Sequence, residues 1–127
     1  MIWLPIDYPS LNDYIKIERT NKYAGAKVKK QYTNTTMYLS MNKGKIKTPC
    51  RLKFTWYVKN KRTDPDNTAF AKKFVLDGLV KAGVLPDDTF KHIKGFIDDF
   101  KVIDNVHKEI GVMIERIEVE WWTLKYS

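Results

Sequence analysis

The sequence predicts one α+β domain, a sandwich in which a mixed or antiparallel sheet of about four strands packs against helices. Its 127 residues, 43% of them hydrophobic, suffice for one core and are too few for two. Segments with helical periodicity come early and strand-like segments come late, which favours an α+β arrangement over a doubly wound parallel sheet. Because no linker or repeat divides residues 1–127, we expect a single domain throughout.

The beginning of the chain is expected to form a short strand followed by a helix. Residues 1–6 are mostly apolar. Ser10 and Asp13 then have the S-x-x-D spacing of a capping box, in which the first side chain accepts a hydrogen bond from a free N–H of the first turn. A helix over residues 11–19 is therefore predicted.

A second, longer helix is predicted to begin near Ala24. Val28, Tyr32 and Leu39 recur at helical spacing, and the polar, glycine-containing stretch at 42–44 would end the helix. Lysines crowd its opening turns, so its N-terminal half should present a basic surface.

Residues 50–58 alternate between apolar and polar side chains, the pattern of a half-buried strand. Cys50 opens the apolar side, and this lone cysteine is expected to be a buried strand residue, because it can supply neither an internal disulfide nor a zinc pair. The other side is cationic with one tyrosine. That surface suits a nucleic acid backbone and an ordinary solvent face equally well.

The rest of the chain is expected to form one long helix and two strands. The helix covers residues 64–82, with Pro65 at its first position and Gly83 placed to end it. The strands are predicted over residues 93–103 and 112–124, which have the composition of strands.

The charge of the chain is unevenly distributed. Residues 16–62 hold fourteen Lys or Arg and one acid, a net +13, whereas the rest holds nine basic and fourteen acidic residues, a net −5. Such a block is either a solvated face or a surface for a polyanion. No apolar run approaches the roughly 20 residues needed to cross a bilayer, so a soluble cytoplasmic protein is expected.

Two carboxylates one residue apart, Asp64 and Asp66, are the first candidate catalytic residues. They follow a basic stretch at a strand-to-helix transition and could place several oxygens around one hard cation such as Mg²⁺. The competing interpretation is structural, because Asp-Pro-Asp-Asn is also a good helix opening with Asp64 as the N-cap.

Helical spacing separates the charged residues that follow. Asp77 would lie roughly 16 Å along the axis from Asp66, too far to share a metal ion, and it should instead pair at i,i+4 with Lys73 or Lys81. The long side chain of Lys73 could reach back toward a phosphate at the metal, which makes Lys73 the better functional candidate.

Taken together, these motifs resemble the RusA-like Holliday-junction resolvases, especially those of phages and prophages. The resemblance covers most of the chain and depends on the order and close spacing of several short motifs rather than on any one of them. The matching segments are Asp64-Pro65-Asp66-Asn67, Lys72-Lys73-Phe74-Val75-Leu76-Asp77-Gly78-Leu79, Gly83, Asp87-Asp88, and, nearer the N-terminus, Pro9-Ser10-Leu11-Asn12-Asp13-Tyr14-Ile15, Glu18-Arg19 and Tyr23-Ala24-Gly25-Ala26-Lys27.

The resemblance implies a site with assigned residues. Asp64, Asp66 and Asp88 would be the metal-binding catalytic acids, with Asp87 as the fallback for the third. Lys73 would contact the scissile phosphate, and Lys72 is its alternative, since the spacing from Asp66 to Asp77 is one helical turn longer than in the bacterial resolvases.

The resemblance also implies the reaction and the partners. The protein would be a homodimeric endonuclease that resolves Holliday junctions and related branched DNA by phosphodiester hydrolysis, with Mg²⁺ as cofactor and Mn²⁺ as a possible substitute. Branched DNA would be recognised mainly by shape and phosphate contacts. The candidate DNA-binding residues are Lys22, Lys27, Lys29, Lys30, Lys59, Lys61 and Arg62.

One geometric difficulty accompanies this assignment. A straight helix to residue 82 would end about 24 Å from Asp66, while the six residues on to Asp88 span at most about 20 Å. The helix must therefore end early or bend, or Asp88 must complete the site across a dimer. Two other functions stay open: a nuclease for flaps or other branches, and a nucleic-acid-binding module without catalysis.

Overall fold

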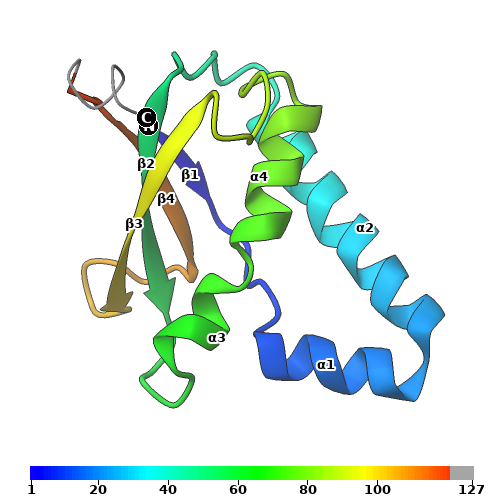
Figure 1. Ribbon diagram of the computed structural model, residues 1–127. Helices are drawn as coiled ribbons and strands as arrows, with labels where there is room; N and C mark the ends of the chain where they lie inside the picture. Colours follow the sequence, from blue (N-terminus) through cyan, green and yellow to red (C-terminus); the bar gives the residue numbers. More distant parts are fainter. Residues whose placement is uncertain (121–127) are drawn as a thin grey trace.

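The computed structural model describes residues 1–120 (Figure 1). Residues 121–124, the end of the last predicted strand, lie outside this range. The elements run in the order expected of an α+β chain, apart from the predicted long helix, which is divided in two. They are β1 Ile2–Leu4, α1 Leu11–Thr20, α2 Lys22–Ser40, β2 Cys50–Val58, α3 Pro65–Ala69, α4 Lys72–Lys81, β3 Ile93–Val102 and β4 Gly111–Ile117.

The four strands form one mixed sheet in the order β1-β4-β2-β3. β4 lies antiparallel to both β1 and β2, and β3 lies parallel to β2 at the edge. The parallel pair requires a crossover, which α3 and α4 supply. The prediction of about four strands in a mixed or antiparallel sheet is confirmed in its mixed form.

The helices cover one side of the sheet (Figure 1). The predicted alternation of β2 is confirmed from Cys50 to Phe54, since Cys50, Leu52 and Phe54 are fully buried while Arg51 is exposed. It fails farther along, because Thr55 of the predicted polar side is buried and Val58 of the predicted apolar side is only half-buried. Cys50 is free and buried, as expected. The core therefore lies between the buried side of β2 and the apolar side of α4, including Val75.

The two N-terminal helices begin with side-chain caps. Ser10 Oγ accepts a hydrogen bond from the Asp13 N–H at 3.2 Å, which confirms the predicted start of α1. Asn21 Oδ1 accepts from the Tyr23 N–H at 2.8 Å, so α2 begins two residues before Ala24. Within residues 1–120, no helix combines the length and apolar character needed to span a membrane.

The predicted helix over residues 64–82 is wrong as a single helix. It divides into α3 and α4 at Phe70 and Ala71, where tight i→i+3 bonds join the Ala71 N–H to Thr68 O and the Lys73 N–H to Phe70 O. The Phe70 ring packs edge-on against Phe74, 5.5 Å between centroids. The chain therefore bends, and the axial distances expected of a straight helix do not apply.

The ends of the last elements follow from local backbone. α4 ends at Lys81, and Gly83 adopts φ +76°, the left-handed conformation that favours glycine after a helix. β3 nearly matches its predicted range. β4 ends at Ile117, several residues before the predicted end of its strand.

Candidate functional site

Asp64 and Asp66 lie at the beginning of α3. Asp64 occupies the N-cap position with extended backbone, but its side chain accepts no capping hydrogen bond. Both residues are exposed, and neither carboxylate forms a hydrogen bond or ion pair with another residue of the described range 1–120. The capping interpretation thus explains the position of Asp64 but does not use its carboxylate, whose oxygens remain available to a hard cation.

Lys73 lies between two acids. Its ammonium is 2.9 Å from Asp77 Oδ1, the predicted i,i+4 pair, and 3.4 Å from Asp88 Oδ2. The hydrogen bond to Asp77 is the main reason that the pKa of Lys73 is raised above its ordinary value. Two of the candidate catalytic residues, Lys73 and Asp88, are therefore in contact although fifteen positions apart.

The third predicted acid does not join the first two within one chain. Among residues 1–120, no group of three acidic, histidine or cysteine side chains lies close enough together to hold one metal ion. Asp87, the fallback acid, accepts a hydrogen bond from the Asp88 N–H at 2.8 Å. The carboxylate chemistry fits Mg²⁺, but a single chain brings together only part of the donor set proposed from sequence.

Lys72, the alternative lysine, is held by a different set of residues. Its ammonium is 2.6 Å from Asp98 Oδ2 and lies over the rings of Phe54 and Phe96, at 5.4 and 4.5 Å from their centroids. Asp98 also accepts a hydrogen bond from Trp56 Nε1 at 2.9 Å. The side chains of Lys72 and Asp98 are only 19% and 24% exposed, so this lysine joins α4 to β3 rather than facing solvent.

An open hollow of about 500 Å³ is bordered by α2, by α4 and by the loop that follows α4. On one side lie Lys29 and Lys30 of the basic helix, and on the other lie Asp77, Asp87 and Asp88. The basic block and the second acid pair, which are distant in the sequence, border the same space.

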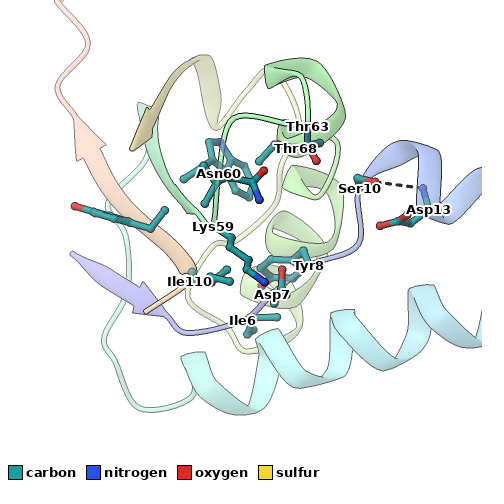
Figure 2. Close-up of a pocket in the computed structure, with 14 residues that line it drawn as sticks. Ile6, Asp7, Tyr8, Ser10, Asp13, Lys59, Asn60, Thr63, Thr68 and Ile110 are labelled. Atoms are coloured by element: carbon teal, nitrogen blue, oxygen red, sulfur yellow. Dashed lines mark hydrogen bonds between the residues drawn. The ribbon is translucent and has the colours of Figure 1, made fainter. Parts of the chain in front are cut away.

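A smaller hollow of about 210 Å³ lies between the segment that joins β1 to α1, the end of β2 and α3 (Figure 2). Lys59 and Asn60 line it from the end of β2, and in Figure 2 the Lys59 side chain extends toward Asp7 and Tyr8. Burial raises the pKa of the Tyr8 phenol, so Tyr8 stays neutral at ordinary pH. Asp64 and Asp66 do not line this space, which makes it a neighbour of the acid pair rather than its pocket.

The residues expected to bind DNA form two exposed groups. One group is on the first half of α2 and the other is in the loop between β2 and α3. Their members, all exposed, are Lys22, Lys27, Lys29 and Lys30 in the first group and Lys59, Lys61 and Arg62 in the second.

No protein-family model matches this chain, and neither does any curated protein or solved structure.

Proposed function

We propose that this protein is a Mg²⁺-dependent endodeoxyribonuclease of the RusA-like type, which cuts Holliday junctions and related branched DNA. The observation that supports it best is the hollow bordered by α2 and α4, which lysines of the basic helix line together with Asp88, itself in contact with Lys73. A nuclease needs this combination, because the cations attract the phosphate backbone while the carboxylates hold a metal ion beside it.

The unused carboxylates at the start of α3 give the second line of support. Asp64 and Asp66 would hold the metal ion, which supplies Lewis-acid activation of water and of the scissile phosphate when bound. Lys73 would hold the phosphate by its charge, since its side chain is 57% exposed and its raised pKa keeps it cationic. Lys72 is the weaker candidate because its side chain is only 19% exposed and its ammonium is enclosed by Asp98 and two aromatic rings, whereas Lys73 keeps its ion pairs at the surface.

The proposed substrate is branched DNA rather than a particular sequence. The two groups of exposed lysines and arginine would contact phosphates, which position a duplex without reading its bases. A four-way junction has two symmetric strands to cut, and a homodimer would present two equivalent sites to them.

The test is cleavage of a synthetic four-way junction, with a flap and a plain duplex beside it, in Mg²⁺ and in EDTA. Wild type should cut the junction only with metal. Asp66→Asn should lower the rate at least about 100-fold, the scale found when one group that stabilises transition-state charge is removed. Glu109→Gln is the matched control, because Glu109 is an exposed acid in the β3–β4 loop.

Each other outcome has a definite meaning. Cleavage of flaps without paired junction nicks would support a nuclease of different branch specificity. Metal-independent binding to all three substrates with no cutting would support a nucleic-acid-binding module. Equal loss in Asp66→Asn and Glu109→Gln would remove Asp66 from the site.

A further inference from the structure

The elbow between α1 and α2 carries an exposed aromatic ring among cations, at a corner of the molecule away from the sheet (Figure 1). Tyr23 is 75% exposed there. The Lys22 ammonium lies over the tyrosine ring, 5.6 Å from its centroid. A single exposed tyrosine is ordinary on a protein surface, but the backbone and the charge around this one set it apart.

The elbow holds the backbone of Tyr23 in place. Asn21 alone joins the two helices. Its N–H donates to Ile17 O at 3.1 Å, which ends α1, and its Oδ1 accepts from the Tyr23 N–H at 2.8 Å, which begins α2. Its carbonyl oxygen accepts from the Ala24 N–H at 3.0 Å. A ligand that meets the ring therefore has little backbone to order, which favours binding.

The charge around the elbow is strongly positive. Residues 16–30 include six Lys or Arg and one acid, Glu18, a net +5. Glu18 packs against Gly25, so closely that a Cβ at Gly25 would lie 2.5 Å from Glu18 Cγ. Gly25 is two residues from Tyr23, about 200° around the helix. The acid thus lies on the opposite side of α2, and the side that carries Tyr23 is cationic.

Tyr23, Lys27 and Lys30 form a stripe along α2, because residues three and four apart share one side of a helix. All three members of this α2 stripe are exposed, and Lys30 also lines the hollow that Asp88 borders. From Tyr23 to Lys30 the helix rises about 10 Å, the length of roughly three nucleotides at about 3.4 Å each. The α2 stripe therefore leads from the hollow to the exposed ring.

We propose that the α2 stripe binds a single-stranded segment of DNA, with phosphates on Lys27 and Lys30 and one base stacked on the ring of Tyr23. Proteins hold single strands by this combination, since cations follow the phosphate backbone and an aromatic ring takes the flat face of any base. Bases inside a duplex are already stacked on their neighbours. The ring therefore adds affinity only for a strand whose bases are free to splay out.

This inference deepens the proposed function, and its bearing on cleavage rests on that proposal. Branched DNA exposes unpaired nucleotides beside the branch. An unpaired base roughly three nucleotides from a phosphate held at the hollow would reach Tyr23, and a plain duplex would lack this contact. Strand binding itself requires neither metal nor cleavage, so it is measurable without either.

The test is the affinity of the whole chain for short fluorescent oligonucleotides, measured by anisotropy in EDTA. Three ligands are compared: oligothymidylate, an abasic strand of the same length that keeps the phosphates without the bases, and a plain duplex. Tyr23→Ala should bind oligothymidylate at least about 5-fold more weakly, the lower end of the effect of losing one base–aromatic stack. It should also lose most of the preference of wild type for oligothymidylate over the abasic strand, and its affinity for duplex should change little. Tyr23→Phe, which keeps the ring, should bind like wild type.

The salt dependence of binding separates the cations from the ring. Lys27→Gln should lower the slope of log affinity against log salt concentration by about 0.7, the contribution of one phosphate of a single strand, whereas Tyr23→Ala should leave the slope unchanged. Tyr38→Ala is the matched control and should bind like wild type. Tyr38 is 68% exposed on the same helix, but it lies within residues 31–41, which include no charged residue.

Thermal melting of every variant shows that it is folded. Absence of binding to oligothymidylate by wild type would overturn the inference. Equal losses in Tyr23→Ala and Tyr38→Ala, or a Tyr23→Ala variant that keeps the preference for a strand with bases, would overturn it too. Because the assay contains no metal and no cleavage, such a failure leaves the proposed nuclease activity standing. Strand binding by a protein that cuts none of the branched substrates would remove the proposed function and leave this inference standing.

Discussion

Adjacent lysines at the beginning of α4 should respond in opposite ways to the same substitution. Lys72→Met should destabilise the fold by about 2 kcal/mol. Breaking a buried ion pair costs about 3–5 kcal/mol and breaking an exposed one about 0–1, and the Lys72–Asp98 pair, with side chains 19% and 24% exposed, lies between these limits. Methionine retains some favourable contact with the rings of Phe54 and Phe96, so loss of the cation–π contacts adds little.

Lys73→Met should change the free energy of unfolding by less than about 0.5 kcal/mol, because ion pairs of an exposed side chain are screened by solvent. The difference is measurable by thermal unfolding. At roughly 2.1 cal/mol/K per residue, a loss of about 2 kcal/mol lowers the melting temperature by about 7 °C, against about 2 °C or less for Lys73→Met. The rate of junction cleavage should show the reverse order: per folded molecule, Lys73→Met should cut more slowly than Lys72→Met.

A double-mutant cycle makes the assignment sharper. Lys72→Met combined with Asp98→Asn should be less destabilising than the sum of the two single changes, with a coupling energy of at least about 1 kcal/mol. Equal melting temperatures for Lys72→Met and Lys73→Met, or a coupling energy near zero, would refute the structural role given to Lys72. A larger drop in the junction-cleavage rate for Lys72→Met than for Lys73→Met, per folded molecule, would exchange the roles proposed for the two lysines.

Three further predictions follow from the site and its supports. If Asp88 completes the partner's site, equal amounts of Asp66→Asn and Asp88→Asn, each inactive alone, should regain up to about one quarter of wild-type nicking when mixed. Half of the dimers would then be mixed, and half of the sites in each mixed dimer would be intact. No recovery after subunit exchange would place both acids in one chain. Ser10→Ala should lose about 1 kcal/mol of stability, and chemical denaturation should show it, since the α1 cap is removed. The hydrogen bond to Asp77 raises the pKa of Lys73 above 10.5, so the contribution of this ion pair to folding stability is complete below that pH and is lost only as the pH rises through the higher folded value. Lys73 should therefore stay charged throughout the working range of the enzyme, and a pH–rate profile should show no lysine step between about pH 6 and 9. A step there that Lys73→Met abolishes would contradict this.

The part of the fold that sequence predicted best is the part governed by local periodicity. The limits of β2 follow from strict alternation, and the start of α1 follows from the spacing of Ser10 and Asp13, so both were predicted closely. The break at Phe70 was missed because a helical pattern of apolar residues continues through it. The bend depends on contacts with Tyr14 of α1, whose ring is 5.3 Å from that of Phe70, and no local signal encodes that contact.

The same distinction applies to the candidate site. The Lys73–Asp77 pair was predicted because residues four apart on a helix are neighbours, whereas the Lys72–Asp98 pair was not. Its partner is on another element, and its position depends on the parallel register that places Asp98 beside Phe54. An aspartate among the apolar residues of a strand was the available signal, because a half-buried carboxylate requires a partner.

The strongest link between sequence and proposed function is the meeting of two charge patterns that lie far apart in the chain. Lys29 and Lys30 belong to the basic block, and Asp87 and Asp88 follow α4, yet all four line one hollow. A carboxylate that must stay ionised beside a phosphate backbone is repelled by it, and nearby lysines offset that repulsion while drawing the backbone in. Exposed lysines alone would serve a binding module equally well. The acids that line the hollow, together with the carboxylates of Asp64 and Asp66 that bind no other residue of the range 1–120, are the observation that favours the proposed nuclease over a binding module.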